Sequence, residues 1–256
     1  MGLCATKNTI ENDEDVYDEI DEDFIIESMS HVDDYTHVKY ETQQDMLDRF
    51  DFENAKVLSE GEISDVYYVK YKNFQDHFLC KVEQLNDDSK VSTFHESENL
   101  KILAKVPNIN RIRDTFEVPQ QYFLILEKYY GLALDQFLIS YVEIKEQGLP
   151  EEVCKFILKG ILDAVRKMHK LGVVHRQLSL EHILFKSHEE YLNEIETKPD
   201  LGIISFNKSM ELYSKEKGFE ADMDAIVGCL GYVAPEIQQV EMGTASEYNF
   251  KCDLWS

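Results

Sequence analysis

The residues best placed to do chemistry lie in the stretch Val173 to Phe185, VVHRQLSLEHILF, where polar side chains stand between two apolar runs. Gln177 is an uncharged amide without proton affinity near neutral pH, so it cannot act as a general base. His182 offers an imidazole, a poor ligand for magnesium because that ion prefers hard oxygen ligands. The stretch is therefore built like a catalytic loop that lacks the groups its chemistry needs.

The stretch resembles the catalytic loop of the eukaryotic protein kinase family, H-R-D-L-x-x-x-N, whose Asp is the base and whose Asn binds magnesium. The chain keeps His175 and Arg176 of this motif. Gln177 stands at the position of the base, and His182 stands at the position of the Asn. Loss of base catalysis costs about 10²–10⁴ in rate, and loss of the metal ligands removes charge neutralisation from phosphoryl transfer. The resemblance implies a pseudokinase; the alternative is neutral drift on a working enzyme.

Residues 50–85 predict strands separated by turns, because apolar and polar side chains alternate within them. The segment resembles the family's glycine-rich hairpin, G-x-G-x-x-G-x-V, of which only the middle glycine remains, as Gly61. Lys81 stands at the position of the lysine in V-A-I-K, and Leu79 replaces the Ala of that motif. Leu adds volume to a close-packed site, so the resemblance implies that Leu79 fills the adenine site from within.

Residues 88–104 predict a helix, and the resemblance implies that this helix carries the acidic partner of Lys81. Glu96 is favoured because Leu residues follow it four and seven positions later, and Glu98 is the alternative. Two strands come next, and the second, YFLILE, is continuously apolar as a buried strand should be. By resemblance, the positions that would contact a nucleotide are Gly61, Val66, Leu79, Lys81, Glu96, the gatekeeper Leu126, Glu127 at the start of the hinge, and Leu184.

Two helices are predicted before the loop, a short one over 131–144 and a longer one over 151–170. Pro150 and Gly172 flank the longer helix, as expected for a helix start and a helix end. Five apolar side chains share one of its faces, since their spacing is three or four residues. These five are Val153, Ile157, Ile161, Val165 and Met168.

The segment LGIISFNKS resembles the strand that leads into the family's D-F-G motif, with Ser205, Phe206 and Asn207 in its place. The second metal carboxylate is then absent as well. In a competing alignment Asp200 is the D-F-G aspartate, but it would follow Pro199, which disrupts a strand. Further on, the family's A-P-E is intact at residues 234–236, and Ser209 and Ser214 are the serines of this segment open to phosphorylation, both expected to be exposed.

Composition narrows the possible partners. The 256 residues carry a net charge of −24, which argues against nucleic acid as a partner. The five cysteines show no paired metal spacing, and their odd number fits a reducing, intracellular setting. They are Cys4, Cys80, Cys154, Cys229 and Cys252.

The first residues, MGLCATK, match the acceptor pattern for N-myristoylation at Gly2. One myristoyl chain binds a membrane only marginally, so a second anchor is needed, and palmitoylation of Cys4 is predicted to supply it. The acidic run over residues 11–23 would be repelled by an anionic leaflet and is predicted to be disordered. The expected location is cytoplasmic, peripheral on a membrane.

The resemblance covers about residues 49–256 and implies an α+β, two-lobed protein kinase fold with an incomplete C-terminal lobe. The implied divisions are an acidic, disordered, acylated leader over 1–48, an N-lobe over 49–126 and a C-lobe over 127–256. The C-lobe stops where the family's central helix begins, at Asp253, so the apolar face of the 151–170 helix is expected to be exposed. The chain is then a fragment, or a partner covers that face.

The function expected from these features is that of a membrane-tethered pseudokinase, a signalling scaffold or allosteric module that binds protein partners. The layout most resembles the serine/threonine, calcium/calmodulin-dependent branch of the family. One alternative is a weakly active serine/threonine kinase that uses Asp200 as a displaced metal carboxylate. Only that alternative calls for ATP and magnesium as cofactors; otherwise none is expected. A further alternative is a non-functional fragment of a longer kinase.

Overall fold

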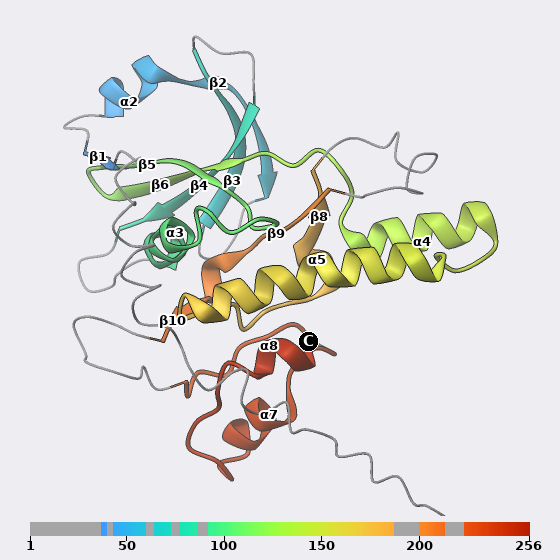
Figure 1. Ribbon diagram of the computed structural model, residues 1–256. Coiled ribbons are helices and arrows are strands. Elements are labelled where there is room, and N and C mark those ends of the chain that lie inside the picture. The colour runs from blue at the N-terminus through green and yellow to red at the C-terminus, as the bar shows by residue number, and fades with distance from the viewer. Residues whose placement is uncertain are drawn as a thin grey trace, which may run out of the picture.

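The computed structural model describes residues 37–39, 43–59, 64–72, 77–85, 92–186, 200–212 and 223–256. A twisted six-stranded sheet and the helix α3 form one half of the molecule, and the longer helices α4 and α5 lie in the other half (Figure 1). This is the α+β, two-lobed arrangement that the sequence predicted. Gly2, Cys4 and Gly61 lie outside the described residues.

The sheet has the strand order β1-β5-β6-β4-β3-β2. Neighbouring strands are antiparallel except β1, which pairs in parallel with β5. The strands are β1 (His37–Lys39), β2 (Phe50–Ser59), β3 (Ser64–Tyr71), β4 (His77–Gln84), β5 (Ile112–Val118) and β6 (Gln121–Glu127).

Regular structure begins earlier than the sequence indicated. The sheet takes its edge strand β1 from the segment predicted as leader, and the helix α2 (Gln43–Arg49) follows before β2. The expectation of disorder therefore fails for these two elements. Strand β1 has only three residues, which is too short for an alternation of apolar and polar side chains to predict it.

The two faces of the sheet pack into different cores. On one face, the rings of Phe50, Phe116 and Phe123 form a stack with centroid distances of 4.8 and 4.6 Å. On the other face, Leu124 and Leu126 join a core that α3 (Ser92–Ile102) shares with the helical half. This second core fixes the sheet against the loop that follows α5.

The helical half holds α4 (Leu134–Lys145), α5 (Glu151–Lys170) and pairs of short strands. Strand β7 pairs with β10, and β8 pairs with β9, so the loop between β7 and β8 is anchored at both ends. The remaining elements are β7 (Val173–Val174), η3 (Leu180–His182), β8 (Ile183–Phe185), β9 (Leu201–Ile203), η4 (Phe206–Lys208), β10 (Met210–Glu211), α7 (Pro235–Glu241) and α8 (Cys252–Trp255).

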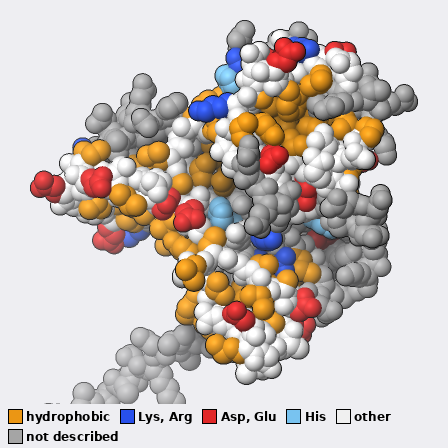
Figure 2. All heavy atoms as spheres, turned by 180° about the vertical axis from the view of Figure 1, so that it is seen from behind, with side chains coloured by type: hydrophobic (Ala, Val, Ile, Leu, Met, Phe, Trp, Pro, Cys, Tyr) orange, Lys and Arg blue, Asp and Glu red, His pale blue; other side chains and the backbone are white. Residues whose placement is uncertain are grey.

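The helix α5 has the predicted bounds, but its predicted apolar face is not exposed. Val153, Ile157, Val165 and Met168 are buried and Ile161 is partly buried. They pack against α3, α4, β8 and β9, so they need no later segment to cover them. The exposed apolar side chains lie elsewhere on the two helices, and Figure 2 shows hydrophobic side chains at the surface over the helical half as well as over the sheet. They are Phe156, Leu158 and Leu162 of α5 and Ile139, Val142 and Ile144 of α4.

Among the described residues, no helix is both long enough and apolar enough to cross a membrane.

Candidate functional site

The centre of the site is an ion pair between β4 and α3. Lys81 Nζ lies 2.6 and 2.7 Å from the two carboxylate oxygens of Glu96, whose side chain is only 1% exposed. Glu98 instead pairs with Lys101 on the outer surface of the helix, at 2.6 Å. The predicted choice of Glu96 over Glu98 is confirmed.

Glu96 also connects α3 to the segment after β9. The backbone N–H of Phe206 donates to Glu96 Oε1 at 3.0 Å, so one carboxylate binds both a side chain and a main-chain group. The ring of Phe206 is buried in the core shared by the two halves and meets the His175 ring edge-on, with centroids 4.7 Å apart. Two further hydrogen bonds tie α3 to the same segment, Ser92 Oγ to Asn207 O and Asn99 Nδ2 to Ser209 Oγ.

Asp253 in α8 holds the loop after β7 in place. Its carboxylate accepts hydrogen bonds from the backbone N–H groups of His175 and Arg176, at 2.8 and 2.7 Å, and contacts His169 Nε2 at 2.9 Å. Arg176 has φ 65°, a conformation that costs free energy for a non-glycine residue. Two of the three contacts of Asp253 are to this turn and keep the loop in place, and the third joins it to His169 of α5.

The imidazole of His175 acts here as a neutral structural group. Burial lowers its pKa to about 4, although the nearby Asp253 carboxylate acts in the opposite direction. Its Nε2–H donates to Ile204 O at 2.9 Å, and its Nδ1 accepts from Gln177 N at 3.2 Å. Both ring nitrogens are thus occupied, and His175 has no free position for proton transfer.

The three positions predicted to lack catalytic groups lie in the loop after β7 and in the segment after β9. Gln177 and His182 are joined, since His182 Nδ1 lies 2.7 Å from the Gln177 carbonyl oxygen. Ser205 lies one residue before Phe206, has φ 68°, and donates from Oγ to Asn207 Oδ1 at 3.2 Å. The side-chain oxygen of Gln177 is buried without a protein hydrogen-bond partner. These side chains present amide, imidazole and hydroxyl groups where the matched motifs have a carboxylate base, a metal-binding amide and a metal-binding carboxylate.

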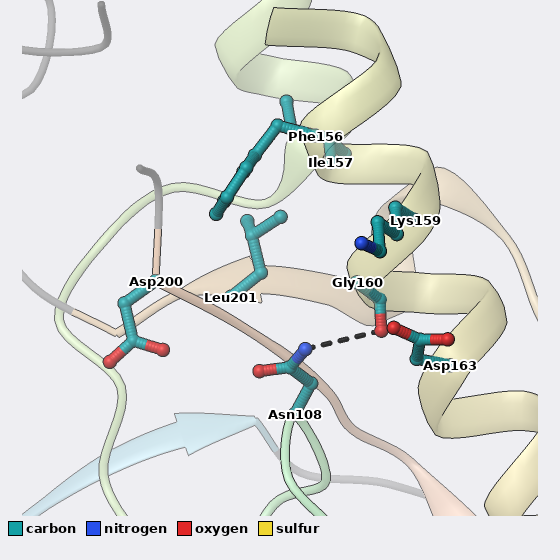
Figure 3. Close-up of a pocket in the computed structure, with 8 residues that line it drawn as sticks. All are labelled: Asn108, Phe156, Ile157, Lys159, Gly160, Asp163, Asp200 and Leu201. Atoms are coloured by element: carbon teal, nitrogen blue, oxygen red, sulfur yellow. Dashed lines mark hydrogen bonds between the residues drawn. The ribbon is translucent and has the colours of Figure 1, made fainter. Parts of the chain in front are cut away.

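Asp200, the alternative metal carboxylate, lies at the other end of β9. The whole of β9, about 10 Å of extended chain, lies between Asp200 and the turn that holds Ser205. The carboxylate of Asp200 pairs with Lys186 Nζ at 2.7 Å. The structure therefore favours the alignment that puts Ser205 at the D-F-G position. Asp200 lines a different hollow of about 420 Å³, bordered by Phe156 and Gly160 of α5 and by Asn108 (Figure 3).

One side of the site is formed by the face of the sheet that carries Lys81. Strand register puts Val66 opposite Lys81, and Tyr68 opposite Leu79, so these four side chains share that face. Leu79 is also paired with Leu126 and packs against the core shared by the two halves. That Leu79 fills the adenine site from within stays a prediction.

Aromatic rings that sequence reasoning missed lie at the hinge end of the site. Lys128 Nζ lies 3.8 Å from the centroid of the Tyr68 ring and 4.4 Å from that of Tyr130. Burial lowers the pKa of Lys128, and the positive charge of Lys56 acts in the same direction. Tyr68 is 60 residues before Lys128 in the chain, so no sequence pattern could have predicted this contact.

The two remaining predicted contacts lie at the edges of the site. Glu127 pairs with Arg113 at 3.3 Å on the outer side of the hinge, and Leu184 is half-buried in β8, bridged to Ala133. The side chain of Arg176 donates hydrogen bonds to the carbonyl oxygen of Lys208 at 2.7 Å and to the hydroxyl of Tyr248 at 3.3 Å.

The expectation that Ser209 is exposed is wrong. Ser209 is 8% exposed, because its hydroxyl donates to Phe206 O and accepts from Asn99. A kinase would have to break both hydrogen bonds to reach it. Ser214 lies outside the described residues.

Comparison with known proteins agrees with this geometry. The family model described as the protein kinase domain matches residues 52–256. The chain is 29% identical over 232 residues to the meiosis-specific serine/threonine-protein kinase mek1 of Schizosaccharomyces pombe, which covers 85% of this chain and 48% of that protein. It is 28% identical over 209 residues to the probable serine/threonine-protein kinase fhkC of Dictyostelium discoideum, covering 80% and 32%. For human serine/threonine-protein kinase D3, the figures are 28% over 206 residues, 78% and 20%. The chain thus spans half or less of the length of these relatives.

Proposed function

The chain belongs to the protein kinase domain family, and from that membership we propose that it is a pseudokinase that works as a binding or allosteric module in signalling. The observation that carries this proposal is the side-chain chemistry at three adjoining positions. Gln177, His182 and Ser205 stand where the family's motifs place a base and two metal ligands.

Each replacement removes a separate contribution to phosphoryl transfer. The amide of Gln177 cannot accept a proton from a hydroxyl substrate near neutral pH. The imidazole of His182 and the hydroxyl of Ser205 supply no negative charge to hold magnesium, whose ligands are carboxylate and phosphate oxygens. Hydrogen bonds hold these three residues and the adjoining Phe206 in place. The site is therefore folded, although the side chains that catalysis needs are replaced.

The adenine side of the site supports the same proposal. Leu79 lies on the sheet face of the site where the family motif has the much smaller Ala, and the Tyr68–Lys128 contact lies at the hinge end. A nucleotide would have to displace both groups. We therefore propose that no nucleotide cofactor is needed for the role of this chain.

A weakly active serine/threonine kinase is the second candidate. Two observations favour it: the similar proteins are named as serine/threonine-protein kinases, and the Lys81–Glu96 ion pair is intact. The position of Asp200 at the far end of β9 weighs against its use as the displaced metal ligand.

A phosphate-transfer assay decides between these candidates. The purified chain is incubated with magnesium and radiolabelled ATP beside a general protein substrate, and Lys81→Met is assayed in parallel. The pseudokinase proposal expects the same background signal from both proteins. Transfer by the wild-type chain that Lys81→Met abolishes would establish the enzyme instead.

Membrane attachment through Gly2 and Cys4 is a separate proposal, supported by the sequence pattern alone. Two lipid chains would bind the membrane stably where one would not. We expect Gly2→Ala to move the chain from the membrane fraction to the soluble fraction, and unchanged fractionation would contradict the proposal. Affiliation with the calcium/calmodulin-dependent branch, and a protein as the bound partner, likewise stay proposals.

A further inference from the structure

Glu83 is a buried carboxylate that the function proposed above does not use. It lies on β4 two residues after Lys81 and is 8% exposed. Its two oxygens accept hydrogen bonds from the backbone N–H groups of Ser92, at 3.2 Å, and Thr93, at 2.6 Å. These two residues begin α3, so a side chain of the sheet caps the helix that carries Glu96.

The helix α3 needs a cap from outside itself. Its first turn contains no acidic side chain. The free N–H groups and the positive end of the helix dipole favour a negatively charged acceptor at this end. The helix has eleven residues, and helices of this length are marginal in water without tertiary contacts. Glu83 thus supplies from β4 a stabilising contact that the sequence of α3 lacks.

Lys81 and Glu83 hold the same helix from the same strand. Residues two apart on a strand point to one face of the sheet. On that face, Lys81 pairs with Glu96 in the second turn of α3, while Glu83 binds the first turn. Tyr122 of β6 stands opposite Glu83 in the sheet and adds a contact from its hydroxyl to Ser97 Oγ at 2.8 Å. The hydrogen bonds of Glu83 therefore fix where α3 begins relative to Lys81.

The corresponding ion pair is a point of control in the protein kinase family, where the position of the helix and phosphorylation decide whether it forms. In this chain, the carboxylate at the start of the helix is part of the fold and needs neither a ligand nor a modification to be in place. We propose that Glu83 is a positioning residue that keeps α3 packed on the sheet, with the Lys81–Glu96 ion pair formed, in the chain without ligand. This proposal stands whether or not the chain transfers phosphate.

Hydrogen exchange of the purified full chain, without nucleotide, tests the cap. Glu83→Ala removes the acceptor. Glu98→Ala is the matched control, since it removes a carboxylate of α3 that is 46% exposed. We expect peptides that cover α3 to exchange about threefold to thirtyfold faster in Glu83→Ala, the factor for loss of one helix cap, and at close to the wild-type rate in Glu98→Ala. Peptides that cover β5 and β6 should be unchanged in both variants and report that the sheet is folded.

Chemical labelling of Lys81 tests the positioning role. An amine-reactive ester labels free Nζ groups, and the Glu96 carboxylate protects Lys81 while α3 is in place. We expect Lys81 to be labelled faster in Glu83→Ala by a factor similar to that of the exchange, while labelling of Lys128 in the hinge stays unchanged. Glu83→Gln keeps an acceptor without the charge, so it should restore part of the protection, and it provides a second comparison if Glu83→Ala does not fold.

Equal exchange of α3 in the wild-type chain and in Glu83→Ala would overturn the proposal. Faster exchange of α3 with unchanged labelling of Lys81 would overturn the positioning role, because the cap would then act on the first turn alone. A change in Glu98→Ala as large as that in Glu83→Ala would also contradict it, since the effect would not be specific to the cap.

Discussion

Two groups of residues at the candidate site differ in how they are held. The frame, defined as Lys81, Glu96, His175, Phe206 and Asp253, is connected by ion pairs, ring contacts and hydrogen bonds across both halves. The side chains of the reactive edge, defined as Gln177, His182 and Ser205, make no ion pair, and their hydrogen bonds are mostly to nearby residues of the same loops. The frame therefore stabilises the fold whether or not the residues of the reactive edge can catalyse a reaction. Substitutions in the frame should therefore be costly, and those in the edge should be tolerated.

The largest effect is expected for Asp253→Ala. Asp253 is 4% exposed and accepts hydrogen bonds from two backbone N–H groups, so its loss leaves buried donors without partners. Removing one partner from a buried charged network lowers the free energy of unfolding by about 3–5 kcal/mol. Urea denaturation followed by circular dichroism measures this value. The matched control is Asp224→Ala, an exposed carboxylate for which we expect no measurable change.

The second effect separates two glutamates of one helix. Glu96→Ala leaves the 13%-exposed Lys81 and the Phe206 N–H unpaired, and we expect the free energy of unfolding to fall by about 2–4 kcal/mol. Glu98→Ala breaks a surface pair with Lys101, which is worth only about 0–1 kcal/mol. Equal losses for the two variants would show that the frame is not the stabilising side.

The third effect is a pH dependence carried by His175. Its pKa is about 4 in the folded chain and 6.5 in the reference state, so the unfolded chain binds the proton more tightly. Its contribution to stability is complete above pH 6.5 and is lost as the pH falls toward 4. Linkage gives a loss of about 2 kcal/mol between pH 7.5 and pH 5. Since carboxylates also titrate, the measured quantity is the difference between wild type and His175→Phe at the two pH values. A His175→Phe variant with the same pH dependence as wild type would contradict this assignment.

The smallest effect is expected at the reactive edge. Ser205→Ala removes one hydrogen bond to Asn207 and leaves the left-handed backbone conformation in place. We expect the free energy of unfolding to change by less than about 1 kcal/mol, the net worth of one such hydrogen bond. A loss as large as that of Glu96→Ala, measured in the same denaturation series, would erase the distinction between edge and frame.

The order and spacing of the motifs were enough to predict which residues occupy the main positions of the site. The positions of Lys81, Gln177, His182 and Ser205 follow from motif order. Helical spacing favoured Glu96 without deciding against Glu98, and only the folded chain shows that Glu96 pairs with Lys81. The fold class followed from the same order, because each degraded motif is flanked by the strand or helix that the family places there.

Contacts made only in the folded chain were missed. Asp253 was read as the start of a helix, since nothing in CDLW indicates that its carboxylate binds a loop 77 residues earlier. The Tyr68–Lys128 stack joins a strand to the hinge and has no sequence signature. Periodicity identified the apolar face of α5 correctly, but it could not say that β8 and β9 already cover that face.

The central claim is that the frame is assembled while the groups that would hold magnesium are absent. It is tested most directly by thermal unfolding of the purified chain with ATP, with and without magnesium, beside Gln177→Asp/His182→Asn/Ser205→Asp as the restored variant. For the wild-type chain, we expect no stabilisation that depends on magnesium. A magnesium-dependent stabilisation of about 2.7 kcal/mol, the value for a ligand at a hundred times its Kd, would contradict the claim.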